Sequence, residues 1–364
     1  ALMKNYCKGP GRGLFFCVLL QLIISCGGCS LGMFPGVKPE EISLLSYNVQ
    51  NLFDDVRDEN EYPDYDPSGD SWNSDLYHVK LLHLSDVVSR FPEGGADILM
   101  LQEVENYNAL DTLNAHYLKG TGYRHCCISN CGDSAVNTAV LSRYPIKNVM
   151  AHSVSLDGRP AGRPILECEI ELDEIRVCLL NCHWKSKSGG AEETEPLRQA
   201  AAAVVAERIL QIHTRDPQRP IILAGDLNEC IDEWEREERA YVTALMDHGG
   251  YEGLPAYQRK KSLGVTGTPV DAEVGNEKVV LLSPWLIEPR PSRGSYAYQG
   301  SWETIDHFLL SPSLKDGQGL EFEDFQVVRD EQLLNNEGFP LRWISELESG
   351  YSDHLPLLLR CRLK

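Results

Sequence analysis

Short apolar segments that end in polar residues recur along most of the chain. The run at 221–224 is bounded by Pro220 and Gly225, and Asp226 and Asn228 follow it in "AGDLNEC". Such a run is too short for a helix and is enclosed by turn-forming residues, so it predicts a core strand with two polar groups at its C-terminal end. Because side chains alternate along a strand, we expect Asp226 and Asn228 to share one face. An Asx turn or a helix N-cap is the alternative explanation.

The alternation of strand-like with helix-like segments predicts the fold class. Some strands, such as the one containing "CEIEL", alternate strictly between apolar and polar residues, whereas others are apolar throughout and must be buried on both faces. This mixture predicts an α/β fold in which helices flank two stacked mixed sheets. The predicted strands are 42–49, 97–104, 137–143, 164–172, 175–184, 221–228, 278–283, 304–311 and 355–363, and the predicted helices are about 76–91, 105–118, 194–213 and 233–248.

Polar residues at or near the strand ends form a candidate site. Each has a structural explanation by itself, for example a turn amide for Asn48 or a first-turn helix acid for Glu103. Their repetition at one strand end after another exceeds what turn formation requires. The candidate residues are Asn48, Glu103, His183, Asp226, Asn228, Asp306, Asp353 and His354.

Six blocks in a fixed order resemble the endonuclease/exonuclease/phosphatase superfamily. This superfamily includes pancreatic-type deoxyribonucleases, exonuclease-III-type AP endonucleases, inositol polyphosphate 5-phosphatases and bacterial sphingomyelinases. The blocks cover about residues 42–363 and read "SYNVQNLFD", "LQEVEN", "NCHWKSKSGG", "AGDLNE", "WETIDHFLLS" and "YSDHLPLLL". The residues in these blocks look most like those of the bacterial exported or lipoprotein branch. The resemblance implies a deoxyribonuclease-like, four-layered α/β sandwich with a metal-dependent site at one edge.

The resemblance also implies roles for the candidate residues. Glu103, with Asn48 and Asp353, would hold Mg²⁺, Mn²⁺ or Ca²⁺, since these hard cations prefer oxygen ligands. Asp226 would orient and deprotonate the attacking water, and Asn228 would donate to the phosphoryl oxygen as charge develops there.

The histidines complete the implied site, and two lysines that follow His183 in the sequence are further candidates. His354 would contact the phosphate or transfer a proton, and Asp306 would fix its ring and favour its charged form. His183 would lie near the leaving group or the scissile phosphate. Lys185 and Lys187 would add phosphate-facing cations, and a solvated loop is the alternative explanation for them.

His307 and a phosphate contact typical of the family's nucleases do not fit this pattern clearly. His307 follows Asp306 on a strand, so its side chain is predicted to face the opposite side and to be structural. Nucleases of the family carry a Tyr or Arg phosphate contact between the glutamate and histidine blocks. In "SAVNTAVLSRYP" only Asn137 and Arg143 are available, and neither is a clear equivalent.

The N-terminal region resembles an export signal. Lys4, Lys8 and Arg12 precede the apolar stretch "LFFCVLLQLII", which is too short to span a bilayer. The residues at 23–26 resemble a bacterial lipobox, in which cleavage leaves Cys26 as a lipid-modified N-terminus. Ordinary signal cleavage near Cys29 without lipid is the alternative. We therefore expect an exported bacterial lipoprotein, anchored in the membrane and facing the periplasm or the cell surface.

The predicted organisation follows from these patterns. It comprises a signal peptide at 1–25, a lipid-anchor tether at 26–40, and an enzymatic domain at 41–364 with an acidic, solvated insertion at about 54–75. Export to an oxidising compartment permits a disulfide among Cys126, Cys127 and Cys131. No protein partner is predicted.

Charge constrains the substrate. The formal net charge of −20 opposes broad electrostatic capture of nucleic acid or anionic lipid, so phosphate chemistry would need local cations or a bound metal. We predict metal-dependent hydrolysis of phosphodiester bonds by a nuclease. A phosphatase or a sphingomyelinase-like phospholipid phosphodiesterase is one alternative, favoured by the acidic surface and the anchor. A surface binding protein that has lost turnover is the other, and the intact candidate set disfavours it.

Overall fold

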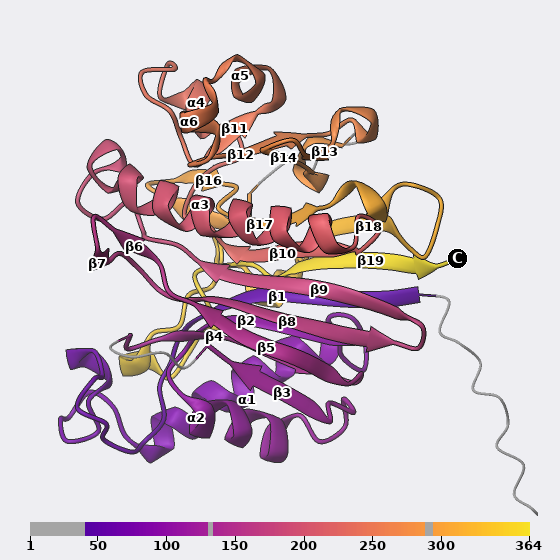
Figure 1. The fold of residues 1–364 in the computed structure, drawn as a ribbon. Helices are drawn as coiled ribbons and strands as arrows, with labels where there is room; N and C mark the ends of the chain where they lie inside the picture. Colours follow the sequence, from indigo (N-terminus) through magenta and orange to yellow (C-terminus); the bar gives the residue numbers. More distant parts are fainter. Residues whose placement is uncertain (1–40, 130–133, 288–293) are drawn as a thin grey trace, which may run out of the picture. The chain divides into compact units, whose positions relative to one another are not determined.

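Two β-sheets stack face to face, and helices cover their outer faces (Figure 1). The computed structural model describes residues 41–129, 134–287 and 294–364. The layers run helices, sheet, sheet, helix, which confirms the predicted α/β sandwich of two mixed β-sheets flanked by helices. The predicted signal peptide, the tether and the lipidation site at Cys26 lie outside the described residues.

The first sheet has six strands. In spatial order they are β18 (Leu320–Val327), β19 (Leu357–Leu363), β1 (Glu41–Leu52), β2 (Ile98–Val104), β4 (Asn137–Ser142) and β3 (His125–Ile128). Strands β1 and β2 are parallel, whereas β19 is antiparallel to β1 and β4 is antiparallel to β2. The C-terminal ends of β1 and β2 therefore lie at the same edge of this sheet.

The second sheet is longer and also mixed. In spatial order its main path is β11 (Leu245–Asp247), β12 (Leu263–Thr266), β14 (Lys278–Leu282), β17 (Asp306–Leu310), β10 (Ile221–Asp226), β9 (Ile175–His183), β8 (Ile165–Leu172) and β5 (Ile146–His152), and β13 (Glu273–Gly275) pairs with β14. Strand β10 is parallel to β9 and antiparallel to β17. The C-terminal ends of β9 and β10 therefore meet the start of β17 at one edge.

Helices on the outer faces and two small hairpins complete the structure. Helices α1 (Ser74–Arg90) and α2 (Tyr107–Thr112) cover the first sheet, and α3 (Ala191–Arg215) covers the second (Figure 1). Two hairpins, β6 (Ser155–Leu156) with β7 (Arg159–Pro160) and β15 (Tyr296–Tyr298) with β16 (Ser301–Glu303), lie off the main sheets. None of the helices in the described ranges is both long and apolar enough to cross a membrane.

Strand β1 shows why the central strands are apolar on both faces. Leu45 and Tyr47 belong to the core under α1, whereas Ile42 and Leu44 belong to the core between the two sheets. Successive side chains of a strand point to opposite faces, so a strand that lies between a helix layer and a second sheet buries both sets. This explains the continuous apolar run at the start of β1.

A buried amide pair joins the two sheets directly. Gln102 of β2 donates from Nε2 to Oδ1 of Asn181 in β9 at 2.8 Å. Asn181 in turn donates from Nδ2 to the carbonyls of Leu101 and Ala139, at 3.0 and 2.9 Å. Both side chains are fully buried. Because a buried amide without partners is costly, these contacts favour one alignment of the sheets over others.

The predicted helix at 233–248 is largely wrong. Only α4 (Glu233–Arg236) is helical, and the chain then continues to strand β11. Glu238 has φ +51°, which interrupts the helix. Further along, the backbone N–H of Ala244 donates to Oε1 of Glu195 at 2.6 Å. Contacts with α3 therefore decide the conformation of this segment, in place of its helix propensity.

The acidic segment at 54–75 is anchored more firmly than a solvated insertion would be. Tyr65 and Trp72 are buried in the core that includes Phe53, and the centroids of their rings are 5.1 Å apart. The indole Nε1 of Trp72 also donates to the carbonyl of Asp54 at 2.7 Å. The acidic residues thus lie on a segment whose path is fixed by two aromatic side chains.

The predicted disulfide does not form between the two described cysteines of β3. Cys126 and Cys127 are both free thiols. Neighbouring residues of a strand point to opposite faces, so their sulfur atoms are directed apart. Cys131 lies outside the described residues.

Candidate active site

Strand register brings three predicted site residues together in the second sheet. The Cα pairing places Asp226 of β10 opposite His183 of β9 on one side and opposite Asp306 of β17 on the other. All three side chains are buried, with between 2% and 3% of their surface exposed. Side chains at paired positions point to the same face of a sheet, so the sheet itself sets their spacing.

Glu103 reaches the same place from the first sheet, where a β-bulge turns it. The pairing of β2 with β1 and with β4 shifts at this residue, and its φ is +66°. A bulge redirects a side chain, and positive φ in a residue other than glycine is a backbone strain that clusters at functional sites. Oε2 of Glu103 accepts from the backbone N–H of Asn51 at 2.8 Å, and Oε1 lies 3.6 Å from Nε2 of His183.

Asn48 joins the groups from the two sheets. Its Nδ2 donates to Oε1 of Glu103 and to Oδ2 of Asp226, both at 3.1 Å. Its Oδ1 accepts from the backbone N–H of Gln50 at 3.0 Å. The amide NH₂ group thus holds two carboxylates near each other and partly offsets their repulsion, while the amide oxygen is used elsewhere. Its role as a metal ligand stays a prediction.

His354 is held by Asp306. Nδ1 of His354 lies 2.8 Å from Oδ2 of Asp306, which also accepts from the hydroxyl of Ser295 at 2.5 Å. Burial lowers the pKa of His354, but Asp306, then Asp226 and Asp353, outweigh burial and raise that pKa well above its ordinary value. The ring is therefore positively charged at neutral pH, and its Nε2 faces Oδ2 of Asp226 at 3.8 Å.

Asp226 is the acid of the group whose protonation is most strongly altered. Burial raises its pKa to about 7, with Asp306 and Glu103 adding to the rise, while the positive charge of His354 and the backbone N–H of Asn228 oppose it. A carboxyl group that titrates near neutral pH exchanges a proton readily in either direction. This is the property that proton abstraction from water requires.

His183 is neutral at the same pH. Burial lowers its pKa well below the ordinary value, and the positive charges of Arg163 and His354 add to this effect. Its Nε2 lies 3.6 Å from Oδ2 of Asp226, too far for a direct hydrogen bond. Its Nδ1 is buried and has no partner among the described residues. An unpartnered imidazole edge inside a polar cluster is suited to contact a bound ligand.

A close group of possible metal ligands combines two acids of the second sheet with His354, which precedes β19 of the first sheet. One donor atom each from Asp226, Asp306 and His354 lie within 4.8 Å of one another. The donors of Asp306 and His354 are hydrogen-bonded to each other, however, so this group functions better as a hydrogen-bonded chain than as a cation cage. The carboxylates of Glu103 and Asp353 are the better candidates.

The chemistry of these two carboxylates fits a divalent cation. The side chain of Asp353 is 33% exposed, with Oδ1 4.0 Å from Nε2 of His354, so it reaches the site from the solvent side. The charges of Glu103 and Asp353 both act on buried Lys80, which places the two acids in the same neighbourhood. Hard oxygen donors with excess negative charge suit Mg²⁺, Mn²⁺ or Ca²⁺.

Asn228 occupies a different position from the one that strand alternation predicts. Strand β10 ends at Asp226, and Asn228 has φ +51°. Its backbone N–H donates to Oδ1 of Asp226 at 2.8 Å, and its Nδ2 lies 3.2 Å from the carbonyl of Trp184. The alternative explanation, an Asx turn, is therefore correct for the local conformation, because the strand stops before alternation can place this residue. A role in catalysis stays a prediction.

The two predicted lysines have other partners. Nζ of Lys187 lies 2.7 Å from Oε2 of Glu233 and 3.9 Å from Oε2 of Glu303. Nζ of Lys185 donates within its own loop, to the carbonyl and hydroxyl of Ser186 at 3.2 Å. The charge of Lys187 is thus already balanced, and their predicted contact with phosphate remains untested.

Arg163 is a candidate residue that sequence reasoning missed. It precedes β8, its positive charge lowers the pKa of His183, and its Nη1 donates to the carbonyl of Trp184 at 3.2 Å. Arg143, by contrast, pairs with Asp97 at 2.9 Å and donates to loop carbonyls, so it is structural. The available signal was the arginine in "GRPILECEI", directly before a buried strand.

His307 lies beside the group but does not join it. Its Nε2 lies 2.8 Å from the carbonyl of Glu229, and burial lowers its pKa to about 4. Because the unfolded chain binds this proton near the ordinary value of 6.5, stability is lost as the pH falls from about 6.5 toward 4.

We expect urea unfolding at a series of pH values to show this loss. The free energy of unfolding should fall by at most about 1.4 kcal/mol per pH unit for each buried neutral histidine. A His307→Gln variant, which keeps a donor toward the carbonyl, should show a shallower slope. Identical slopes in the two proteins would contradict the assignment.

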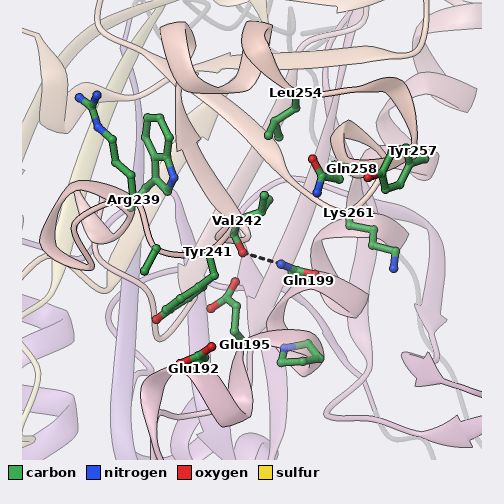
Figure 2. Close-up of a pocket in the computed structure, with 13 residues that line it drawn as sticks. Glu192, Glu195, Gln199, Arg239, Tyr241, Val242, Leu254, Tyr257, Gln258 and Lys261 are labelled. Carbon is green, nitrogen blue, oxygen red and sulfur yellow. Dashed lines mark hydrogen bonds between the residues drawn. The ribbon is translucent and has the colours of Figure 1, made fainter.

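A surface pocket of about 680 Å³ lies away from this site (Figure 2). It is formed by the first turns of α3, the segment after α4, and α6 (Ala256–Arg259), and its walls include Glu195, Gln199, Tyr241 and Lys261. Gln199 closes one side by donating to the carbonyl of Val242 at 2.6 Å. None of the predicted site residues lines this pocket.

Comparisons with known proteins identify the family and the fold. Residues 43–240 match a model described as the Endonuclease/Exonuclease/phosphatase family. No curated protein matches the sequence significantly.

Solved structures share the fold. Truncated TDP2 from Caenorhabditis elegans has a TM-score of 0.52 and 17% identity over 88% of this chain and 98% of that chain. TDP2 from D. rerio, in complex with a single-strand DNA product, has a TM-score of 0.53 and 15% identity over 88% and 99%. A 3′-5′ exonuclease from Neisseria meningitidis has a TM-score of 0.50 and 17% identity over 89% and 100%.

Proposed function

The chain belongs to the endonuclease/exonuclease/phosphatase family, and on this basis we propose that it is a metal-dependent phosphodiesterase that cleaves nucleic acid. One observation carries the proposal. Acids, an amide and imidazoles from six separate chain segments meet at one edge of the two sheets, with contacts between 2.8 and 3.8 Å. The residues are Asn48, Glu103, His183, Asp226, Asp306 and His354.

The proposed mechanism assigns each group a step. Glu103 and Asp353 would hold the divalent cation, which would neutralise charge on the non-bridging phosphate oxygens. Asp226, with a pKa of about 7, takes the proton of the attacking water. His354 contributes a positive charge beside the phosphate, and Asp306 keeps its ring oriented and protonated.

Neutral His183 and positively charged Arg163 complete the proposal. The unpartnered nitrogen of His183 leaves it able to donate to, or accept from, the leaving oxygen. Arg163 lies near enough to His183 to lower its pKa, so it would contribute the phosphate contact for which the sequence offered no clear equivalent. A guanidinium group suits this contact because its planar donors match phosphate geometry.

Two structural relatives support a nucleic acid substrate. One was solved with a single-strand DNA product and another is a 3′-5′ exonuclease. Single strands also place fewer phosphates near the acidic surface than a duplex does, and this reduces the repulsion expected from a net charge of −20.

A phosphatase or a phospholipid phosphodiesterase is the second candidate. The observation that favours it is the pairing of Lys187 with two glutamates, which removes a cation that a long polyanion would use. A substrate with a single phosphoester needs only the cation, His354 and Arg163.

A substrate panel tests the proposal. We expect the purified protein to cleave single-stranded DNA with Mg²⁺ or Mn²⁺, and EDTA to abolish cleavage, because the proposed mechanism depends on the cation to neutralise charge on the phosphate oxygens. Plasmid DNA, RNA, inositol phosphates and sphingomyelin complete the panel. Turnover of sphingomyelin without any DNA cleavage would favour the second candidate.

Matched histidine variants control this experiment. His354→Gln should remove turnover, whereas His307→Gln, which alters a neighbouring buried histidine bonded to Glu229, should retain it. Cleavage that survives both EDTA and His354→Gln would overturn the proposal.

We also propose export and lipid anchoring at Cys26, on the basis of the N-terminal sequence alone. The protein would then act in the periplasm or at the cell surface of a bacterium. Mass spectrometry of the mature N-terminus tests this. A mature chain that begins with an unmodified residue beyond Cys26 would rule out the anchor.

A further inference from the structure

Lys80 is a fully buried lysine that the proposed mechanism does not use. It lies on α1 with 0% of its surface exposed, and Nζ donates to the carbonyl of Tyr351 at 3.0 Å. The same Nζ lies 5.2 Å from the centroid of the Trp343 ring. Lysines are seldom fully buried, because removing an ammonium group from water is costly. A buried lysine therefore needs a compensating interaction.

The segment that Lys80 contacts leads directly to the candidate site. Tyr351 precedes Asp353 and His354 in "YSDH". The same segment is held from α1 by His83, whose Nδ1 lies 2.7 Å from the carbonyl of Gly350. A second contact from α1 thus accompanies that of Lys80.

Strand β1 contacts the same part of the chain, from Trp343 to Ser352. Gln50 and Trp343 exchange two hydrogen bonds, at 2.8 and 3.1 Å. The hydroxyl of Ser352 donates to the carbonyl of Asn48 at 2.7 Å. The position of Asp353 and His354 is therefore set jointly by β1 and by α1, and Lys80 supplies a charged contact on the α1 side.

The charge of Lys80 also acts on the two carboxylates that suit a cation. Burial lowers its pKa to about 7, and Asp353 and Glu103 act against this shift. Interactions act in both directions, so an ammonium group that these acids stabilise also stabilises them. In a buried site such an interaction is weakly screened and extends over several ångströms.

We propose that Lys80 is a positioning residue that prepares Glu103 and Asp353 for the catalytic cation. Its ammonium group offsets the repulsion between the two carboxylates before a cation binds, and its hydrogen bond fixes the segment that carries Asp353. The inference rests on the proposed function. It has a specific consequence, because a fixed positive charge beside a cation site weakens cation binding while it improves the geometry for turnover.

Replacement of Lys80 by methionine separates these effects. Lys80→Met keeps a long apolar side chain and removes the charge. We expect it to bind Mn²⁺ about tenfold more tightly, by calorimetry without substrate at about pH 6.5, where most of the lysine carries its charge. With saturating Mn²⁺ its kcat should fall by about tenfold. A loss of folding alone would weaken both properties together.

Further variants keep the test decisive. Lys80→Gln retains a donor toward the Tyr351 carbonyl without the charge, so it should bind Mn²⁺ as tightly as Lys80→Met, and it serves if the methionine variant does not fold. Lys147→Met is the charge-matched control, because Lys147 is 51% exposed and pairs with Glu171 on β8. Its Mn²⁺ affinity should equal that of the unaltered protein.

The outcomes separate the inference from the proposed function. If the unaltered protein binds no divalent cation, the proposed function fails. If it binds Mn²⁺ and both Lys80 variants bind it with unchanged or weaker affinity, Lys80 serves folding only and the inference is overturned.

Discussion

The replacement Asp226→Asn is expected to lower kcat by about 10²- to 10⁴-fold, the range for loss of a general base. Asparagine keeps the size of the side chain but has no carboxylate to accept a proton from water. Asp226 is buried, with 2% of its surface exposed, so an external base cannot readily replace it. Steady-state rates at saturating Mg²⁺, on the best substrate of the panel, measure the effect.

The stability of the same variant distinguishes chemistry from folding. In the metal-free protein the folded state holds a proton on Asp226 up to about pH 7, whereas the unfolded chain releases it near 3.8. Stability contributed by this group therefore falls as the pH rises through that window. Asp226→Asn removes the buried charge, so at pH above 7 its urea midpoint should equal or exceed that of the unaltered protein. A lower midpoint that parallels the loss of turnover would contradict the assigned role.

The replacement Arg198→Ala is expected to lower the free energy of unfolding by about 3–5 kcal/mol, the usual cost of breaking a buried ion pair. Arg198 is fully buried, 2.6 Å from Oε2 of Glu195 and 3.1 Å from Oε2 of Glu229. It also lies 3.3 Å from the carbonyl of Lys185. Its removal would leave two buried carboxylates without a counter-charge and would release the loop after His183. Urea unfolding measures the loss.

Another arginine of the same helix provides the control. Arg208 pairs with Glu167 at 2.8 Å, but its side chain is 15% exposed, so water can solvate the glutamate after truncation. Arg208→Ala should therefore cost less than Arg198→Ala. Equal costs would show that the buried network around Arg198 adds nothing beyond an ordinary ion pair.

Much of the candidate site could be predicted because the ends of buried strands can be recognised from the sequence. The segment before Asp226 is apolar, short and enclosed by turn residues, and the structure ends β10 at this residue. His183 likewise ends β9, and Asp306 begins β17. Once the resemblance fixed the order of the strands, the proximity of these three residues followed from parallel and antiparallel pairing.

Other features could not be predicted because they depend on contacts between distant segments. Nothing in "LQEVEN" indicates the bulge at Glu103, because the positive φ of this glutamate is imposed by residues that surround it in the folded protein. The segment after α4 reads as a helix but is held extended by Glu195 and Glu229. Arg163 lies 20 residues before His183, and only the folding of β8 against β9 brings it near.

The amide pair between Gln102 and Asn181 has a consequence for how the enzyme can change over evolution. Glu103 directly follows Gln102 in the first sheet, and His183 lies two residues after Asn181 in the second. A slip of one sheet past the other by a single residue would move the two groups several ångströms apart, since a strand rises about 3.3 Å per residue. New substrates are therefore more accessible through altered loops at the rim than through altered sheet packing.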